Sequence, residues 1–301
     1  MAIGDVVSVE AGQCTDVRYV DTGMYGTADY GSVYVVDAER PAVVDTGIGT
    51  NHERILAALR ASGIERDAPL AIAVTHVHLD HAGGAGLLAE AFPNATVYVH
   101  EIGARHLVDP TRLVEGTKRA VGDQWTFYTE PVPVDADRVV ELTDGDRIDL
   151  GDRGLVAHHA PGHAPHQVVF EYPAAEAVFT ADAAGIWVPA LDAVKETSPP
   201  PNFDLEACLA DTRTIEALDP ETLLFAHFGP RETGDLLADY RETLTEWVEA
   251  VRERRAELDD GALQDHFADR AETASVWGER KARAETKMNV RGVCTMLDRA
   301  E

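Results

Sequence analysis

The sequence predicts a mixed protein of the α/β or α+β class, and three observations lead to this prediction. Short apolar runs broken by glycine and aspartate recur between residues 17 and 45 and again between 139 and 180, as expected for the strands of buried sheets. Each of these strand-rich halves is followed by stretches in which apolar residues recur with helical spacing. The chain has 301 residues, 45% of them hydrophobic, which is enough for one large domain or a domain with an appendage.

The individual elements follow from these patterns in chain order. In the first half we expect strands at residues 17–20, 32–36, 42–44 and 96–99, and helices over 51–61 and 86–92. In the second half we expect strands at residues 139–140, 147–150, 155–158, 168–172, 177–180 and 223–226, and a helix over 205–218. Two strand-rich halves, each followed by helices, suggest two sheets packed face to face with the helices outside.

Two segments exceed what such a scaffold requires. Residues 101–137 form an insertion with helical and aromatic character, and residues 231–301 form a C-terminal helical extension with helices expected over 235–255 and 274–296. We expect this extension to pack on the domain formed by residues 1–230. The apolar face of the helix over 235–255 should cover the core or a second subunit of a homodimer, and not a membrane, because its polar face is acidic.

The most informative segment follows the apolar run at residues 70–74 and places four metal-ligand side chains within six residues: His76, His78, Asp80 and His81. A buried strand that ends in such a loop would direct several imidazole and carboxylate groups into one small volume. These groups suit zinc, manganese or iron, and no thiolate lies nearby. Three further candidates each follow a β-like stretch: His163, Asp182 and His227.

The order of these motifs, HxHxDH followed by His, Asp and His, closely resembles the metallo-β-lactamase superfamily of hydrolases over roughly residues 15–230. The resemblance implies a four-layer αββα sandwich and a site for two divalent metal ions. It implies that His76, His78 and His163 hold one ion. The second ion would be held by Asp80, His81 and His227, with Asp182 bridging the two. Two ions ~3.5–4 Å apart suit a bridging carboxylate, and a water shared between them loses a proton near neutral pH.

Zinc is the expected metal, with iron or manganese as alternatives, and Asp80 and Asp182 are the expected catalytic carboxylates. The resemblance implies a dinuclear hydrolase in which a metal-bridging hydroxide cleaves a small ester, thioester or lactone. True β-lactamases of this fold carry Cys or Ser near the position of Asp182, which argues against antibiotic hydrolysis. Gly185 replaces the Tyr of acyl-homoserine-lactone lactonases, and no Gly-Cys-Gly signature of glyoxalase II follows. The chain is most similar to a glyoxalase-II-like subgroup, and a lactonase or a mono-iron dioxygenase of a thiol-derived substrate, like the persulfide dioxygenases, stays as an alternative.

Residues around the ligands predict how the site is completed. Asp45, in the segment 43–47, matches an aspartate of the family and is expected to orient a ligand histidine, although it could also be an ordinary turn residue. A small-molecule substrate should be selected by loops above the metals. We expect its pocket to be lined by aromatic residues of the insertion and of the loop after Asp182: Trp125, Phe127, Tyr128 and Trp187. The alternative role for these aromatic side chains is to anchor the insertion.

The charge of the chain indicates its environment. Acidic residues outnumber basic ones 53 to 26, giving a formal net charge of −27 that is spread along the sequence. Concentrated salt would screen the resulting repulsion, so we expect a halophile's protein; a surface for a basic partner would concentrate the charge in blocks. The charge argues against nucleic-acid partners. The chain start lacks a signal-peptide pattern and no apolar run approaches the ~20 residues of a membrane helix, so we expect a cytoplasmic protein.

Overall fold

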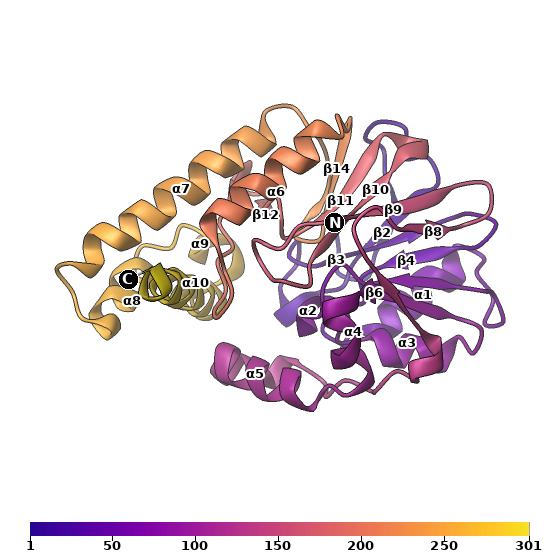
Figure 1. Cartoon of the computed structure of the whole chain (residues 1–301), viewed down its shortest axis with the longest axis horizontal. Helices are drawn as coiled ribbons and strands as arrows, with labels where there is room; N and C mark the ends of the chain where they lie inside the picture. Colours follow the sequence, from indigo (N-terminus) through magenta and orange to yellow (C-terminus); the bar gives the residue numbers. More distant parts are fainter. Residues whose placement is uncertain (301) are drawn as a thin grey trace.

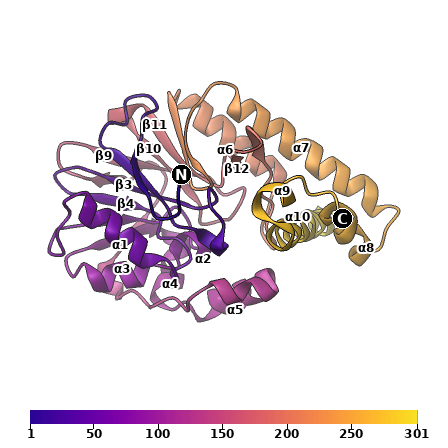
Figure 2. The same cartoon turned by 180° about the vertical axis from the view of Figure 1, so that it is seen from behind.

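The computed structural model describes residues 1–300 and consists of two sheets packed face to face with helices on both outer faces (Figures 1 and 2). This arrangement confirms the predicted four-layer αββα sandwich. A third, two-stranded sheet adds β12 (Ile186–Val188) and β13 (Ala193–Lys195), which pair antiparallel. Within the described part of the chain no helix combines the length and the hydropathy of a membrane span.

The first sheet has seven strands in sequence order: β1 (Val6–Ser8), β2 (Val17–Asp21), β3 (Ser32–Val36), β4 (Ala42–Val44), β5 (Ala71–Ala73), β6 (Thr96–His100) and β7 (Val139–Leu142). The strands from β1 to β4 pair antiparallel, whereas those from β4 to β7 pair parallel. Parallel neighbours need crossover connections, and helices supply most of them. The segments between β4, β5 and β6 contain α1 (His52–Ala61), α2 (Leu79–Ala82) and α3 (Ala85–Ala91).

The second sheet has six strands, in the spatial order β15 (Gly229–Glu232), β14 (Thr222–Phe225), β11 (Ala177–Ala181), β10 (Val168–Tyr172), β9 (Gly154–His159) and β8 (Arg147–Asp149). Only β11 and β14 pair parallel, and all other neighbours pair antiparallel. Consequently β9, β11 and β14 run in the same direction, and their carboxyl ends lie at one edge of the sheet.

Strand residues alternate between the central core and the outer helical layers. In β3, Tyr34 and Val36 face the second sheet, while Val33 and Val35 pack under the outer helices. In β10, Phe170 lies between the sheets and Val169 faces the helices on the other side. Because both faces of each sheet are covered, these strands read as continuous apolar runs, as is usual for doubly covered sheets.

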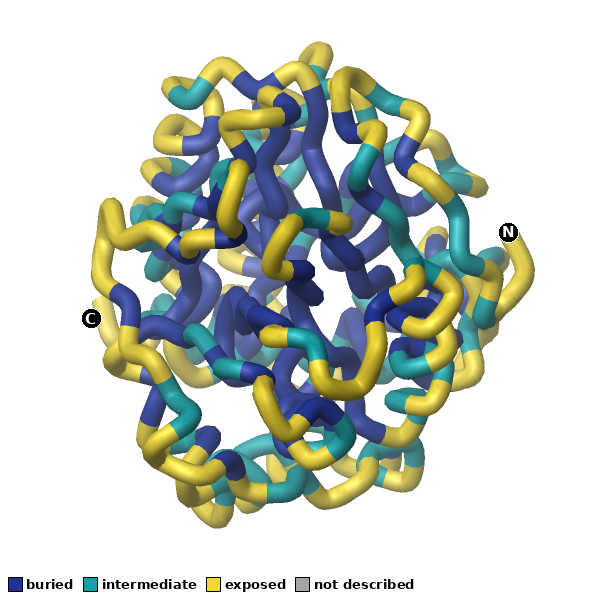
Figure 3. Tube along the Cα trace, turned by 90° about the vertical axis from the view of Figure 1, so that its right-hand side faces the viewer, coloured by how far each residue is buried: buried dark blue, intermediate teal, exposed yellow. Residues whose placement is uncertain are grey.

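The helices divide between the two outer faces. The first sheet is covered by α1, α3 and α4 (Glu101–Val108). The second sheet is covered by α6 (Leu205–Ala217) and α7 (Leu236–Arg255), while α8 (Asp260–Ala268) and α10 (Glu279–Ala300) pack against α7 beside the sandwich. The remaining helical elements are α5 (Thr111–Val121), α9 (Ala274–Trp277) and the 3-10 turns η1 (Met24–Gly26), η2 (Gly122–Phe127), η3 (Ala136–Arg138) and η4 (Pro173–Ala175). Figure 3 shows that the buried segments occupy the centre of the molecule, with exposed loops around the rim.

Several expected elements needed correction. The single helix expected over residues 274–296 is two helices, because Gly278 adopts φ 79° between α9 and α10, a conformation that breaks a helix and that glycine tolerates best. The helix α8 was not expected, nor were the strands β1, β12, β13 and β15, which are only three or four residues long. Short strands of this kind carry too few residues for a clear alternation.

The insertion and the C-terminal extension meet beside the sandwich. Residues 101–137 form α4, α5, η2 and the first part of η3, and in Figures 1 and 2 α5 projects beneath the body of the molecule towards α10. The Arg291 guanidinium of α10 donates to the carbonyl of Ala120 at 2.8 Å. The helix α7 packs against α6, β13 and α10. The boundary at residue 230 between a catalytic domain and an extension stays a prediction.

Candidate metal centre

All seven predicted ligand residues lie at one end of the sandwich, because each follows the carboxyl end of a strand. The residues 76–81 follow β5, His163 follows β9, Asp182 follows β11 and His227 follows β14. The common direction of β9, β11 and β14 brings their three residues to the same edge of the second sheet. The loop after β5 approaches this edge from the first sheet, so the seven side chains meet between the two sheets.

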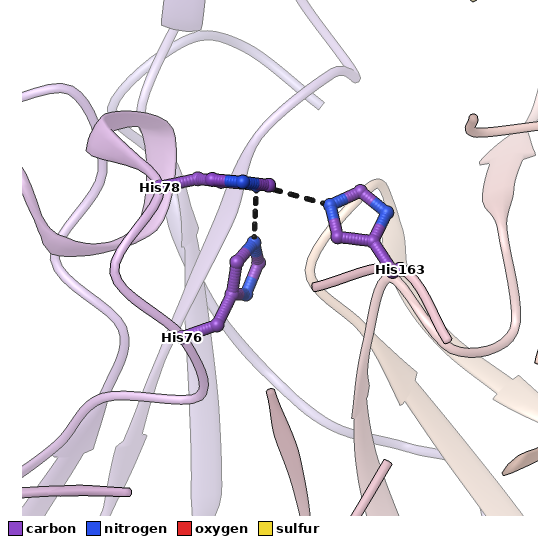
Figure 4. Close-up of side chains that lie close together, drawn as sticks. All are labelled: His76, His78 and His163. Carbon is purple, nitrogen blue, oxygen red and sulfur yellow. Dashed lines mark hydrogen bonds between the residues drawn. The ribbon is translucent and has the colours of Figure 1, made fainter. Parts of the chain in front are cut away.

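The first group of ligands consists of three histidines whose ring nitrogens converge (Figure 4). The Nδ1 atom of His78 lies 3.0 Å from Nε2 of His76 and 3.1 Å from Nε2 of His163. Burial, with smaller contributions from neighbouring histidines, lowers the pKa of His76 and His163 well below the ordinary value. Burial likewise lowers the pKa of His78, to about 4. The imidazoles are therefore neutral at pH 7 and carry lone pairs that a cation can accept.

The second group consists of Asp80, His81 and His227, whose candidate ligand atoms lie within 4.8 Å of one another. The Nε2 atoms of His81 and His227 are 3.3 Å apart. Burial acts against protonation of His81, but the carboxylates of Asp182, Asp45 and Asp80 outweigh it and raise the pKa to about 10. Burial acts to raise the pKa of Asp80, and the imidazoles of His81 and His227 nevertheless lower it. This group therefore concentrates negative charge that a cation would balance.

Asp182 lies between the two groups. Its Oδ2 atom is 3.1 Å from Nε2 of His163 in the first group, and its Oδ1 atom is 3.6 Å and 3.5 Å from Nε2 of His81 and His227 in the second. The side chain is buried, and Oδ1 has no hydrogen-bond partner. An ionised oxygen without a partner is costly to bury, so these residues fit a pair of divalent cations with Asp182 shared between them.

Three of the histidines are held in orientation through their Nδ1 atoms. His81 Nδ1 donates to Oδ2 of Asp45 at 2.9 Å, His227 Nδ1 donates to the carbonyl of Tyr30 at 2.9 Å, and His163 Nδ1 lies 3.4 Å from the Thr197 hydroxyl. When a metal displaces any proton from Nε2, the proton that stays on Nδ1 keeps its acceptor, so that Nε2 is the ligand atom. Asp45 thus makes the contact with a candidate ligand histidine that its predicted orienting role requires.

The predicted substrate residues separate into two places. Phe127 and Tyr128 pack with Tyr25 and Tyr30 in an aromatic cluster that also contains Ile186, Val188 and Trp277. Trp125 stacks on Tyr128, with ring centroids 5.3 Å apart. We call this set the aromatic wall; it reaches the metal centre through Tyr30, whose ring centroid is 5.0 Å from that of His227.

The structure does not bring Trp187 to the aromatic wall. Trp187 packs with the helices on the outer face of the second sheet, and the Arg231 guanidinium lies 4.9 Å from its ring centroid. Because side chains alternate along β12, Ile186 and Val188 face the wall instead. The sequence did not predict that Tyr25, Tyr30 and Trp277 belong to the aromatic wall. Only the glycine-rich segment at residues 23–31, which contains the two tyrosines, marks an unusual backbone there.

Other histidines near the site have separate partners. His166 lies beside the first group, where its Nδ1 atom is 3.4 Å from the Val77 amide and its ring centroid is 5.6 Å from that of His78. His158 pairs with Glu171, and His159 stacks on His100 with centroids 4.3 Å apart. None of these four histidines belongs to a metal-ligand cluster among residues 1–300.

Comparison with known proteins agrees with this geometry. The family model described as the Metallo-beta-lactamase superfamily matches residues 26–227, a range that contains all seven ligand residues. The chain belongs to the metallo-β-lactamase superfamily. Proteins of this superfamily are generally hydrolytic and bind metal ions.

Two similar proteins, one of them with a solved structure, illustrate the comparison. A metallo-beta-lactamase fold-containing protein of Sulfurisphaera tokodaii is 25% identical over 221 residues, covering 72% of this chain and 79% of that protein. The acyl-coenzyme A thioesterase MBLAC2 of Bos taurus is 28% identical over 181 residues, which cover 55% of this chain and 62% of the thioesterase. The same archaeal protein has a solved structure, which superposes on this chain with a TM-score of 0.65 at 19% identity and covers 98% of this chain and 99% of its own.

Proposed function

We propose that this protein is a dinuclear metal-dependent hydrolase of a small ester or thioester. The observation that carries the proposal is the position of Asp182, whose two oxygens face different groups of ligand nitrogens at 3.1–3.6 Å. A carboxylate shared in this way suits two cations held close together. The ligand set of six imidazole or carboxylate side chains around Asp182 favours zinc, with iron and manganese as alternatives.

The residues around the metal centre would have separate roles in such a reaction. Two bound ions would supply Lewis acidity and a water that deprotonates near neutral pH. The hydrogen bonds from His81 to Asp45 and from His227 to Tyr30 hold the ligand nitrogens in one orientation. Asp182 and Asp80 balance the charge of the second group. The aromatic wall would exclude water from one side of the site and contact the apolar part of a substrate.

Ester or thioester substrates are favoured over lactams for two reasons. An aspartate stands at position 182, where β-lactamases of this fold carry a different residue, and the acyl-coenzyme A thioesterases similar to this chain cleave a thioester. We therefore assign the protein to a glyoxalase-II-like group of thioester and ester hydrolases. Lactone cleavage uses the same attack on an acyl carbon and stays an alternative, as does an iron-dependent oxygenation of a thiol-derived substrate.

The experiment is metal analysis combined with a substrate panel. Protein purified without chelator should contain close to two zinc ions per chain and should hydrolyse thioesters or esters faster than lactones or β-lactams. Asp182→Asn should lower both the metal content and hydrolysis, because two cations would then face each other without a shared negative charge. Asp16→Asn is the matched control, since Asp16 accepts hydrogen bonds from Arg153 and Tyr172 at the opposite end of the strands.

Two results would count against the proposal. Full metal content and full activity in Asp182→Asn would show that Asp182 does not join the two groups. A wild-type content of one iron per chain, with oxygen consumed during turnover of a thiol-derived substrate, would favour the dioxygenase alternative.

A further inference from the structure

Lys281 of α10 is a buried cation in a chain that has only four lysines. Its side chain is 7% exposed, and its ammonium group lies 2.5 Å from a carboxylate oxygen of Glu285, which is 9% exposed. The other three lysines, Lys118, Lys195 and Lys287, also form ion pairs, but their side chains are 23–42% exposed. Burying an ion pair costs desolvation free energy that apolar side chains of similar size would not cost, so packing by itself does not explain a lysine here.

The contacts of Lys281 lead towards the metal centre. Its Nζ atom lies 3.9 Å from the ring centroid of Tyr25 and 4.3 Å from that of Tyr30, which is within the range of cation–π attraction. Trp277, the last residue of α9, meets the Tyr30 ring edge-on, with ring centroids 5.0 Å apart. Two residues from the C-terminal segment therefore fix the ring of Tyr30 from outside the sandwich.

Tyr30 connects these contacts to His227. Its carbonyl accepts the Nδ1 proton of His227 at 2.9 Å, and its ring lies against the His227 imidazole with centroids 5.0 Å apart. Tyr30 is thus the residue that both holds the tautomer and sets the ring plane of His227. Tyr25 supports it from the side, with a ring centroid 5.5 Å away and a hydroxyl that is hydrogen-bonded to the hydroxyl of Tyr128 in the insertion.

We propose that Lys281 is a positioning residue of the metal centre: held by Glu285, it fixes Tyr30 against His227 and so couples the C-terminal helix α10 to the second group of ligands. This inference rests on the proposed two-ion site. The tyrosines lie on the side of that second group, since Tyr30 contacts His227 through both its carbonyl and its ring and Tyr25 packs against Tyr30. The C-terminal extension is accordingly part of the metal centre's support, although none of its residues belongs to the ligand set.

The test compares Lys281→Met with Lys287→Met, the same substitution on the same helix at a lysine that pairs with Asp265 and is one-third exposed. Zinc is titrated calorimetrically into metal-free protein to obtain an affinity for each ion. In parallel, the ring Nδ1–H signal of His227 is followed by NMR in metal-free protein, with His227→Gln used to assign it. A double variant, Lys281→Met with Glu285→Gln, removes the buried carboxylate that the single variant leaves without its partner.

We expect Lys281→Met to lower the affinity for the second zinc ion about 10–100-fold, the range typical of residues that orient a ligand. The affinity for the first zinc ion should stay unchanged. The His227 ring proton should exchange faster, the double variant should show the same two changes at near wild-type thermal stability, and Lys287→Met should show neither. Wild-type zinc affinity and ring-proton exchange in Lys281→Met, or their recovery in the double variant, would overturn the inference. A wild-type protein that binds one ion would refute the two-ion proposal instead, while the His227 signal would still test the coupling to Lys281.

Discussion

Replacing Asp45 by asparagine should weaken metal binding while the protein stays folded. Asp45 is buried, with Oδ1 accepting the Thr75 amide at 2.8 Å and Oδ2 accepting the His81 Nδ1 proton at 2.9 Å. Asparagine has one acceptor oxygen, and keeping the bond to Thr75 turns its amide hydrogens towards His81. Neutral His81, the form that binds a metal, would then have to accept at Nδ1 and carry its proton on Nε2, the atom that faces Asp182 and His227.

The size of the effect follows from the bond that is lost. A zinc ion requires the Nε2 lone pair, so zinc binding would force His81 back to the tautomer with its proton on Nδ1. In that tautomer the Nδ1–H group would point at the amide hydrogens of the new asparagine, and no hydrogen bond would form. A hydrogen bond to a charged group contributes about 1.5–3 kcal/mol, and each 1.4 kcal/mol is tenfold in affinity. We therefore expect the zinc affinity of the second group to fall about 10–100-fold, with a much smaller change at the group of His76, His78 and His163.

The assay is chelator competition for zinc at pH 7, combined with thermal unfolding of the metal-free protein. Asp16→Asn serves as the control, because it also removes a carboxylate that accepts hydrogen bonds and lies at the far end of the strands. Both variants should lose comparable stability, and only Asp45→Asn should lose zinc affinity. The tautomer argument would be refuted by wild-type zinc affinity in Asp45→Asn, or by equal losses of affinity in the two variants.

Three further predictions follow from the charges and the packing. Burial raises the pKa of Asp211 from 3.8 to about 6, so the folded protein holds the carboxyl proton more tightly than the unfolded chain does. The stability that this preference contributes is complete below pH ~4 and is lost as the pH rises through 6. Asp211→Asn should therefore be more stable than the wild type at pH 8 by up to about 3 kcal/mol and match it near pH 4, as measured by urea unfolding; equal differences at both pH values would contradict this. The melting temperature should rise from low to molar KCl, because salt screens the repulsion of a chain with net charge −27, and a flat or falling profile would exclude the halophile interpretation. Phe127→Ala should alter the ranking of substrates at unchanged metal content, because Phe127 belongs to the aromatic wall. Trp187→Ala should mainly reduce the free energy of unfolding, by about 3–5 kcal/mol, since its ring packs under the outer helices. The opposite pattern would place the substrate pocket on the side of Trp187.

The fold class and the convergence of the candidate ligand residues could be predicted from the sequence because their signals are local. The run from His76 to His81 follows an apolar strand directly, and His163, Asp182 and His227 each follow another. Side chains at the carboxyl ends of strands that run in one direction must lie at the same sheet edge. Their convergence was therefore predictable once the strands were recognised, and the structure brings all seven together.

Other predictions depended on which face of an element a residue occupies. Trp187 was expected at the substrate because it lies five residues after Asp182, but alternation along β12 directs it to the opposite face from Ile186 and Val188. A shift of one residue in a strand exchanges the two faces, so closeness in sequence did not fix the direction of this side chain.

The sequence by itself determined which side chains are available as metal ligands and the succession of strands and helices along the chain. The tertiary structure decided which residues support the candidate metal centre. Tyr30, Trp277 and Lys281 come from segments about 250 residues apart, and no periodicity or spacing relates them. They meet only because α10 packs beside the sandwich edge, where Lys281 approaches the ring of Tyr30 and Tyr30 holds His227. Local sequence patterns specify backbone conformation and the buried face of an element, but contacts between distant segments depend on how complete surfaces fit together.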